Sequence, residues 1–87
     1  MKNKNLLITG AATRVGKAIA LHFAEKGWNI ALHYFRSSSK AKELKKIIEQ
    51  NWVKVALIKT DLKNPKQVEK IIPLAKKKLG AIDCLIN

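Results

Sequence analysis

The 87-residue chain has little cysteine, few acidic residues and no long apolar run, and each shortage excludes a class of protein. Its single cysteine, Cys84, provides neither a disulfide framework nor a cluster of metal ligands, and we expect an inert thiol buried in a strand. Near the N-terminus, Arg14 and Lys17 interrupt the apolar residues before these reach the length of a signal-peptide core, and no segment could span a bilayer. The sequence therefore predicts a globular, cytoplasmic protein with no membrane anchor and no metal site.

Acidic residues number only six against eighteen basic ones, and the resulting formal net charge of +12 raises the question of nucleic-acid binding. Most of the lysines lie in two windows, 40–46 and 59–78, where they alternate with apolar residues at helical spacing. Aromatic residues, which would stack on bases, make up 6% of the chain and do not interleave these lysines. We therefore expect the lysines to cover solvated helix faces, with no nucleic-acid partner.

Apolar runs and amphipathic stretches alternate along the chain, which predicts an α/β fold. Strands are expected at 5–9, 28–34, 53–59 and 82–86, and helices at 15–26, 39–50 and 65–80. Asn64 should cap the third helix, with Pro65 in its first turn and Gln67 completing a capping box, while Pro73 should kink or split it. His22 is expected to pack on the apolar face of the first helix.

Strands separated by helices pair in parallel, with right-handed crossovers. The predicted fold class is the N-terminal part of a Rossmann-type doubly wound parallel sheet, with four strands in the order 3-2-1-4 and three helices. Residues 1–87 would form a single dinucleotide-binding half-domain.

A glycine-containing loop follows the first strand and precedes the first helix, where dinucleotide folds bind a pyrophosphate. Gly10 permits the tight turn, Gly16 allows close packing of helix on sheet, and Ala11 and Ala12 leave room for phosphates. The middle glycine of the usual G-x-G-x-x-G spacing is absent, and Arg14 stands near its place.

The second strand ends without the acidic residue that would bind the ribose 2′-hydroxyl of NAD, since no acid lies between Glu25 and Glu43. Arg36 and a run of serines follow instead, and together with Arg14 they predict a site for the 2′-phosphate of NADPH. The alternative is that Arg36 and the serines form only a polar turn and a helix cap. His33 could line the phosphate site, although a structural role suits it better.

Asp61 follows the third strand, at the carboxyl edge where open parallel sheets bind ligands. It could contact the adenine amino group, with Leu62 packing on the adenine face. Alternatively, Asp61 is a turn residue ahead of the Asn64 cap.

These residues carry a resemblance to a known family. Thr9-Gly10-x-x-x-Arg14-x-Gly16 resembles the coenzyme motif T-G-x-x-x-G-x-G of short-chain dehydrogenases/reductases, Asp61-Leu62 resembles that family's adenine site, and residues 80–87 resemble the approach to its N-N-A-G segment, cut after the first asparagine. The arginine in the loop and the run His33-Tyr34-Phe35-Arg36-Ser37 are most similar to pteridine reductases, although Phe35 departs from the polar or basic residues often found there. The resemblance implies NADPH as cofactor, bound by Gly10, Arg14, Val15, Gly16, His33, Tyr34, Phe35, Arg36, Ser37, Asp61, Leu62 and Asn87.

The catalytic residues of that family are not found in this chain. The resemblance would require a serine and a Y-x-x-x-K pair, but Tyr34 is the only tyrosine and Ser38 stands four positions after it. We therefore expect a truncated reading frame or fragment, inactive alone, from the cofactor-binding part of a pteridine (dihydropteridine or dihydrofolate type) reductase. A 3-oxoacyl-carrier-protein reductase, another short-chain reductase, and a non-catalytic nucleotide-binding remnant are the alternatives. A full-length protein would take a pterin or carbonyl substrate and form a homotetramer, as the resemblance implies.

Overall fold

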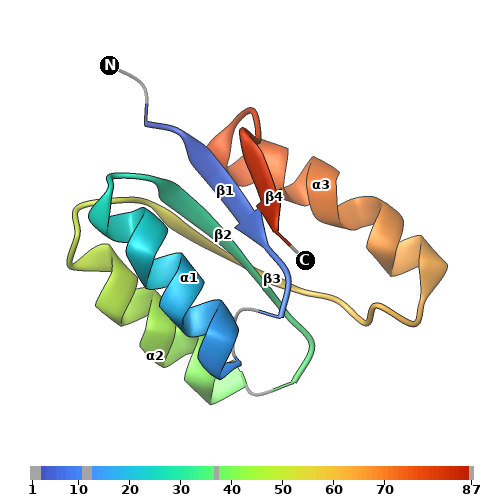
Figure 1. The fold of residues 1–87 in the computed structure, drawn as a ribbon. Coiled ribbons are helices and arrows are strands. Elements are labelled where there is room, and N and C mark those ends of the chain that lie inside the picture. The colour runs from blue at the N-terminus through green and yellow to red at the C-terminus, as the bar shows by residue number, and fades with distance from the viewer. Residues whose placement is uncertain (1–2, 11–12, 37, 87) are drawn as a thin grey trace.

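The computed structural model describes residues 3–10, 13–36 and 38–86. These residues form a four-stranded parallel sheet in the order β3-β2-β1-β4. Helices α1 and α2 cover one face of the sheet and α3 covers the other (Figure 1). The elements are β1 (Asn5–Ile8), α1 (Arg14–Glu25), β2 (Asn29–Tyr34), α2 (Ser38–Glu49), β3 (Val55–Lys59), α3 (Pro65–Leu79) and β4 (Cys84–Ile86). The predicted strand order and helix number are confirmed.

Two apolar layers hold the helices to the sheet. On the α1 and α2 side, Leu6 and Ile8 pack with Ile30 and Leu32 against Ala20 and other small or branched residues of the helices. On the α3 side, the core is smaller and consists of Leu7, Ala31, Ile58, Ile71 and Ala75. β1 and β2 contribute to both layers, so every residue of these two strands is buried.

Several local predictions were wrong. His22 is exposed, because α1 turns the small side chains of Ala20 and Ala24 to the sheet instead. Of the two effects predicted for Pro73, a kink or a split, the split does not occur, since α3 runs without interruption from Pro65 to Leu79. Cys84 is half-buried, because β4 is an outer strand.

The third helix begins as predicted, but its capping box does not form. Asn64 caps α3 by accepting a hydrogen bond from the Lys66 N–H through its side chain. The Gln67 side chain accepts instead from the Asp61 N–H, at 2.7 Å, and so anchors the preceding loop.

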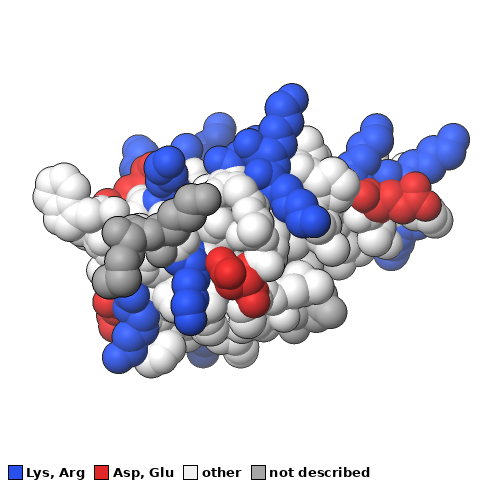
Figure 2. All heavy atoms as spheres, turned by 90° about the horizontal axis from the view of Figure 1, so that it is seen from above, with Lys and Arg blue, Asp and Glu red and all other residues white. Residues whose placement is uncertain are grey.

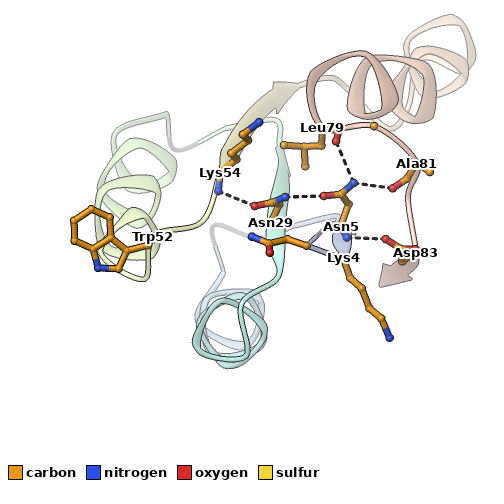
Figure 3. A pocket seen from close by; sticks show the side chains of 10 residues that line it. Lys4, Asn5, Asn29, Trp52, Lys54, Leu79, Ala81 and Asp83 are labelled. Carbon is orange, nitrogen blue, oxygen red and sulfur yellow. Dashed lines mark hydrogen bonds between the residues drawn. The ribbon is translucent and has the colours of Figure 1, made fainter. Parts of the chain in front are cut away.

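β3 and β4 each begin two residues later than predicted, because side chains replace the expected ladder bonds there. The Lys54 N–H donates to the side chain of Asn29, and the Asn5 N–H donates to the Asp83 carboxylate, each at 2.8 Å. Both contacts belong to a polar network at the amino ends of the strands, which forms the base of a pocket of about 550 Å³ (Figure 3).

Two buried asparagines form the centre of this amino-end network. The Asn5 side chain donates to the carbonyl oxygens of Leu79 and Ala81 and accepts from the Asn29 amide at 3.0 Å. Because Asn29 also accepts from Lys54, the network joins β1, β2, the start of β3 and the end of α3 (Figure 3).

On the face of the molecule seen in Figure 2, basic side chains project at many points and acidic ones are fewer. One apolar area lies at the outer strand β4, where Leu85 is 49% exposed and Ile72 of α3 is similarly open. Together with Leu7 and Cys84 they line a hollow of about 320 Å³. Exposed strand edges with apolar side chains favour association between copies.

We expect the chain to be monomeric at low salt and to self-associate as salt rises. The charge of +12 keeps copies apart until it is screened, and the Debye length falls to about 8 Å near 0.15 M salt. Light scattering across a salt series, with circular dichroism to follow folding, measures this. Leu85→Asn should suppress association, whereas Trp52→Ser, which removes an exposed aromatic side chain outside this hollow, should not. A chain that stays monomeric and folded at high salt would contradict the prediction.

Candidate cofactor site

The turn after β1 is built around Gly10, which has a φ of +65°. This left-handed conformation is open to glycine at little cost and is strained for other residues. The Gly10 carbonyl accepts hydrogen bonds from both the N–H and the hydroxyl of Thr13, at 3.2 and 2.9 Å. The predicted tight turn is thus present, and it returns the chain directly to the start of α1.

Thr13 caps α1 and directs the helix N-terminus toward the turn. Its hydroxyl oxygen accepts from the Gly16 N–H at 3.1 Å, and Gly16 is buried within the first turn. Arg14 and Val15 are the first two helical residues, and both side chains are exposed. The first N–H groups of a helix lack helical partners and carry partial positive charge, so this end of α1 is suited to an anion.

A cleft of about 350 Å³ lies between α1 and α2, beside this helix start. Three of its lining side chains are basic, Arg14, Lys17 and Lys40, and only Glu43 is acidic. Leu44 and Ile47 complete the lining with apolar surface. Neither Lys17 nor Lys40 was among the site residues predicted from the sequence. The available signal was the spacing of Arg14 and Lys17, which lie three residues apart on one face of a helix.

The end of β2 divides the predicted site residues into buried and exposed ones. Tyr34, its last residue, is buried, whereas Phe35 and Arg36 beyond it are exposed. The Arg36 guanidinium lies 5.5 Å from the centre of the Phe35 ring, which is cation–π range. Phe35 therefore positions the arginine, and Arg36 itself lies outside the lining of the cleft that contains Arg14. Ala11, Ala12, Ser37 and Asn87 lie outside the described residues.

His33 lies inside the molecule, with 2% of its side chain exposed. Its Nε2 is 3.1 Å from the Thr60 carbonyl oxygen, while its Nδ1 and the Thr60 hydroxyl have no partner among the described residues. This burial fits the structural role that the sequence favoured for His33, although only one ring nitrogen is hydrogen-bonded.

Asp61 and Leu62 follow β3 at the same edge of the sheet as the glycine turn. The Asp61 carboxylate accepts from the Lys63 N–H at 2.9 Å, and its carbonyl accepts from the Asn64 N–H. Asp61 thus does shape the turn ahead of the cap, which was the alternative interpretation. Leu62 is more than half exposed and presents apolar surface there.

The chain thus has a strand, a glycine turn and a capped helix in that order. Beyond the end of β2, where an NAD-binding fold has an acidic residue, it has the basic residue Arg36. A sequence model of the family described as "short chain dehydrogenase" matches residues 4–87. The chain belongs to the short-chain dehydrogenase/reductase family.

Relatives within this family differ in their described roles. The 3-oxoacyl-[acyl-carrier-protein] reductase FabG of Staphylococcus epidermidis is 33% identical over 98% of the chain, and general stress protein 39 of Bacillus subtilis is 34% identical over all of it. The chain spans only 35% and 30% of those two proteins.

Solved structures superimpose closely on the chain. A short-chain dehydrogenase from Oenococcus oeni gives a TM-score of 0.92 at 38% identity, over 99% of this chain and 40% of that one. FolM alternative dihydrofolate reductase 1 from Brucella canis, complexed with NADP, gives 0.87 at 29% identity, over 95% of this chain and 33% of that one.

Within the part of the chain that the structure describes, no group of three potential ligands among His, Cys, Asp and Glu could hold a metal ion. The helices of the same part are too short or too polar to cross a membrane.

Proposed function

We propose that the chain is the NADPH-binding portion of a short-chain reductase. The observation that supports this most directly is the basic cleft at the start of α1, where Arg14, Lys17 and Lys40 lie together. A phosphate accepts strong, charge-assisted hydrogen bonds from such groups, whereas the ribose hydroxyl of NAD calls for an acid.

The residues of the site fit the parts of this cofactor. The N-terminus of α1 and the turn at Gly10 would hold the pyrophosphate, and Arg14 and Arg36, with Ser37, would face the 2′-phosphate. Asp61 and Leu62 would border the adenine, and His33, Tyr34 and Asn87 complete the proposed set. When bound, NADPH supplies the hydride of the reduction, and the residues of this chain bind and orient it.

For the substrate of the whole protein we propose a pterin of the dihydropteridine or dihydrofolate type. The loop arginine and the run His33–Arg36 favour this, and the neighbour from Brucella is described as a dihydrofolate reductase. A 3-oxoacyl thioester is the second candidate, favoured by the identity to FabG. Assays of the full-length protein with a dihydropterin and with a 3-oxoacyl thioester distinguish these two substrates. We propose that the full-length protein is a cytoplasmic homotetramer. A non-catalytic nucleotide-binding product is the remaining alternative.

We expect the chain to bind NADPH more tightly than NADH. Arg14→Ala or Arg36→Ala should each reduce this preference by about 1–3 kcal/mol, roughly five- to 150-fold in the ratio of dissociation constants. Isothermal titration with both cofactors measures the ratio, and Lys66→Ala, on α3, is the matched control. Equal affinity of the unmodified chain for the two cofactors would refute the proposed 2′-phosphate site.

A further inference from the structure

Among the residues that the structure describes, β3 pairs only with β2, so the outer edge of β3 is the second open edge of the sheet. At its two ends, the Ile30 N–H donates to the Lys54 carbonyl and the Thr60 N–H donates to the Tyr34 carbonyl, each at 3.0 Å. The backbone N–H and C=O groups of the even-numbered residues in segment 54–60 therefore point toward β2. By the alternation of a parallel ladder, the N–H and C=O groups of Val55, Leu57 and Lys59 face outward.

Lysines from two helices and from the residue just before β3 surround this edge. A groove of about 440 Å³ runs along it, here called the β3 groove, and it is lined by Lys45, Lys54, Val55, Ala56, Leu57, Lys78 and Leu79. Lys45 comes from α2 on one side of the sheet, and Lys78 comes from α3 on the other. The Lys78 ammonium donates to the outward Leu57 carbonyl at 3.1 Å. The groove thus offers strand backbone and positive charge together, with no acidic side chain in its lining.

We propose that the β3 groove binds an extended acidic segment of a partner protein, which adds to the sheet as a fifth strand. Main-chain hydrogen bonds to the outward groups of Val55, Leu57 and Lys59 would supply affinity, as in other cases of strand addition. Successive side chains of an extended segment point to opposite faces, so neighbouring carboxylates would meet Lys45 on one face and Lys78 on the other. The incoming strand would replace the Lys78 ammonium at the Leu57 carbonyl and leave that ammonium to a carboxylate.

An acidic peptide fits this groove better than a nucleic acid does. The regular spacing of outward backbone groups matches another strand and has no counterpart in a phosphate backbone. No aromatic side chain, on which a base would stack, belongs to the lining. Lysines at a strand edge commonly serve only to prevent pairing with other strands, through their charge. If that were their only role here, the acidic peptide would not bind in the groove.

The test uses the 87-residue chain and a fluorescent ten-residue glutamate peptide, with binding followed by anisotropy. Lys45→Glu with Lys78→Glu should weaken binding by roughly tenfold or more, whereas Lys66→Glu with Lys70→Glu, an equal charge change on α3 outside the groove, should weaken it less than about threefold. Circular dichroism checks that the glutamate variants fold. If they do not, the double variant Lys45→Gln with Lys78→Gln replaces them, and it should also weaken binding of the peptide.

Two further readouts separate strand addition from simple charge attraction. A peptide of the same charge with alternate backbone nitrogens methylated should lose most of its affinity. Hydrogen exchange at Val55, Leu57 and Lys59 should slow when the unmethylated peptide binds. Equal weakening by both pairs of glutamate substitutions, full binding of the methylated peptide, no binding at all, or tighter groove-dependent binding of a single-stranded oligonucleotide would each overturn the proposal.

Discussion

The 87-residue chain on its own should oxidise no NADPH with any dihydropterin or carbonyl substrate, even where it binds the cofactor. Reduction in this family relies on a tyrosine acting as general acid, supported by a lysine four residues later. The only tyrosine here, Tyr34, is 9% exposed within β2, and Ser38 stands four positions after it. A buried side chain without that lysine has neither access to a substrate nor the neighbouring cation on which this proton donation relies.

Loss of nicotinamide absorbance, followed at increasing chain concentration, measures this activity. Arg14→Ala is a useful companion, because it weakens the proposed cofactor site without touching Tyr34. A trace of contaminating reductase would give the same rate in both preparations. Turnover that rises with chain concentration and falls in Arg14→Ala would show that the chain is catalytic.

Asn29→Ala should cost about 2–4 kcal/mol of the free energy of unfolding, because it leaves two groups without partners. The Asn5 side-chain carbonyl and the Lys54 N–H both bond to Asn29, whose side chain is 8% exposed. A domain of this size has on the order of 4–13 kcal/mol in total, so the substitution removes a large part of its stability.

Urea unfolding followed by circular dichroism gives the free energy of each variant. Asn51→Ala is the matched control, since the Asn51 side chain makes a single hydrogen bond, to the Ile48 carbonyl, just beyond the end of α2. It should cost less than about 1 kcal/mol. Similar unfolding midpoints for the two variants would show that the amino-end network does not stabilise the fold.

Periodicity predicted the elements and their order because the two inner strands and three amphipathic helices leave few other ways to bury their apolar residues. It failed at the starts of β3 and β4, where Asn29 and Asp83 side chains take the place of ladder groups. Such contacts join residues far apart in the sequence, so they cannot be predicted from a local sequence pattern. The exposure of His22 has a similar cause, since packing selected the smaller residues of α1 for the interface.

The candidate site was predictable where the backbone itself requires a residue type. Gly10 has the positive φ expected of it, and Arg14 lies at the helix start. Lys17 and Lys40 were missed because their meeting depends on how α1 packs beside α2. The contact of Phe35 with Arg36 was also unforeseen, since it needs the side-chain geometry beyond β2.

The position of β1 between β2 and β4 has a consequence for how the chain folds during synthesis. β1 can pair with β2 as soon as residue 34 has left the ribosome. Its pairing with β4, by contrast, joins residues far apart in the chain, and Asn5 and Asp83, which are hydrogen-bonded, are 78 positions apart. The entropy cost of closing so long a loop comes before the free energy gained when β1 and β4 pair. We therefore expect the pairing of β1 with β4 to be the slow step of folding. While β3 and α3 are being made, the nascent chain therefore carries β1 with one edge unpaired, and an exposed apolar strand edge of this kind favours association with other chains.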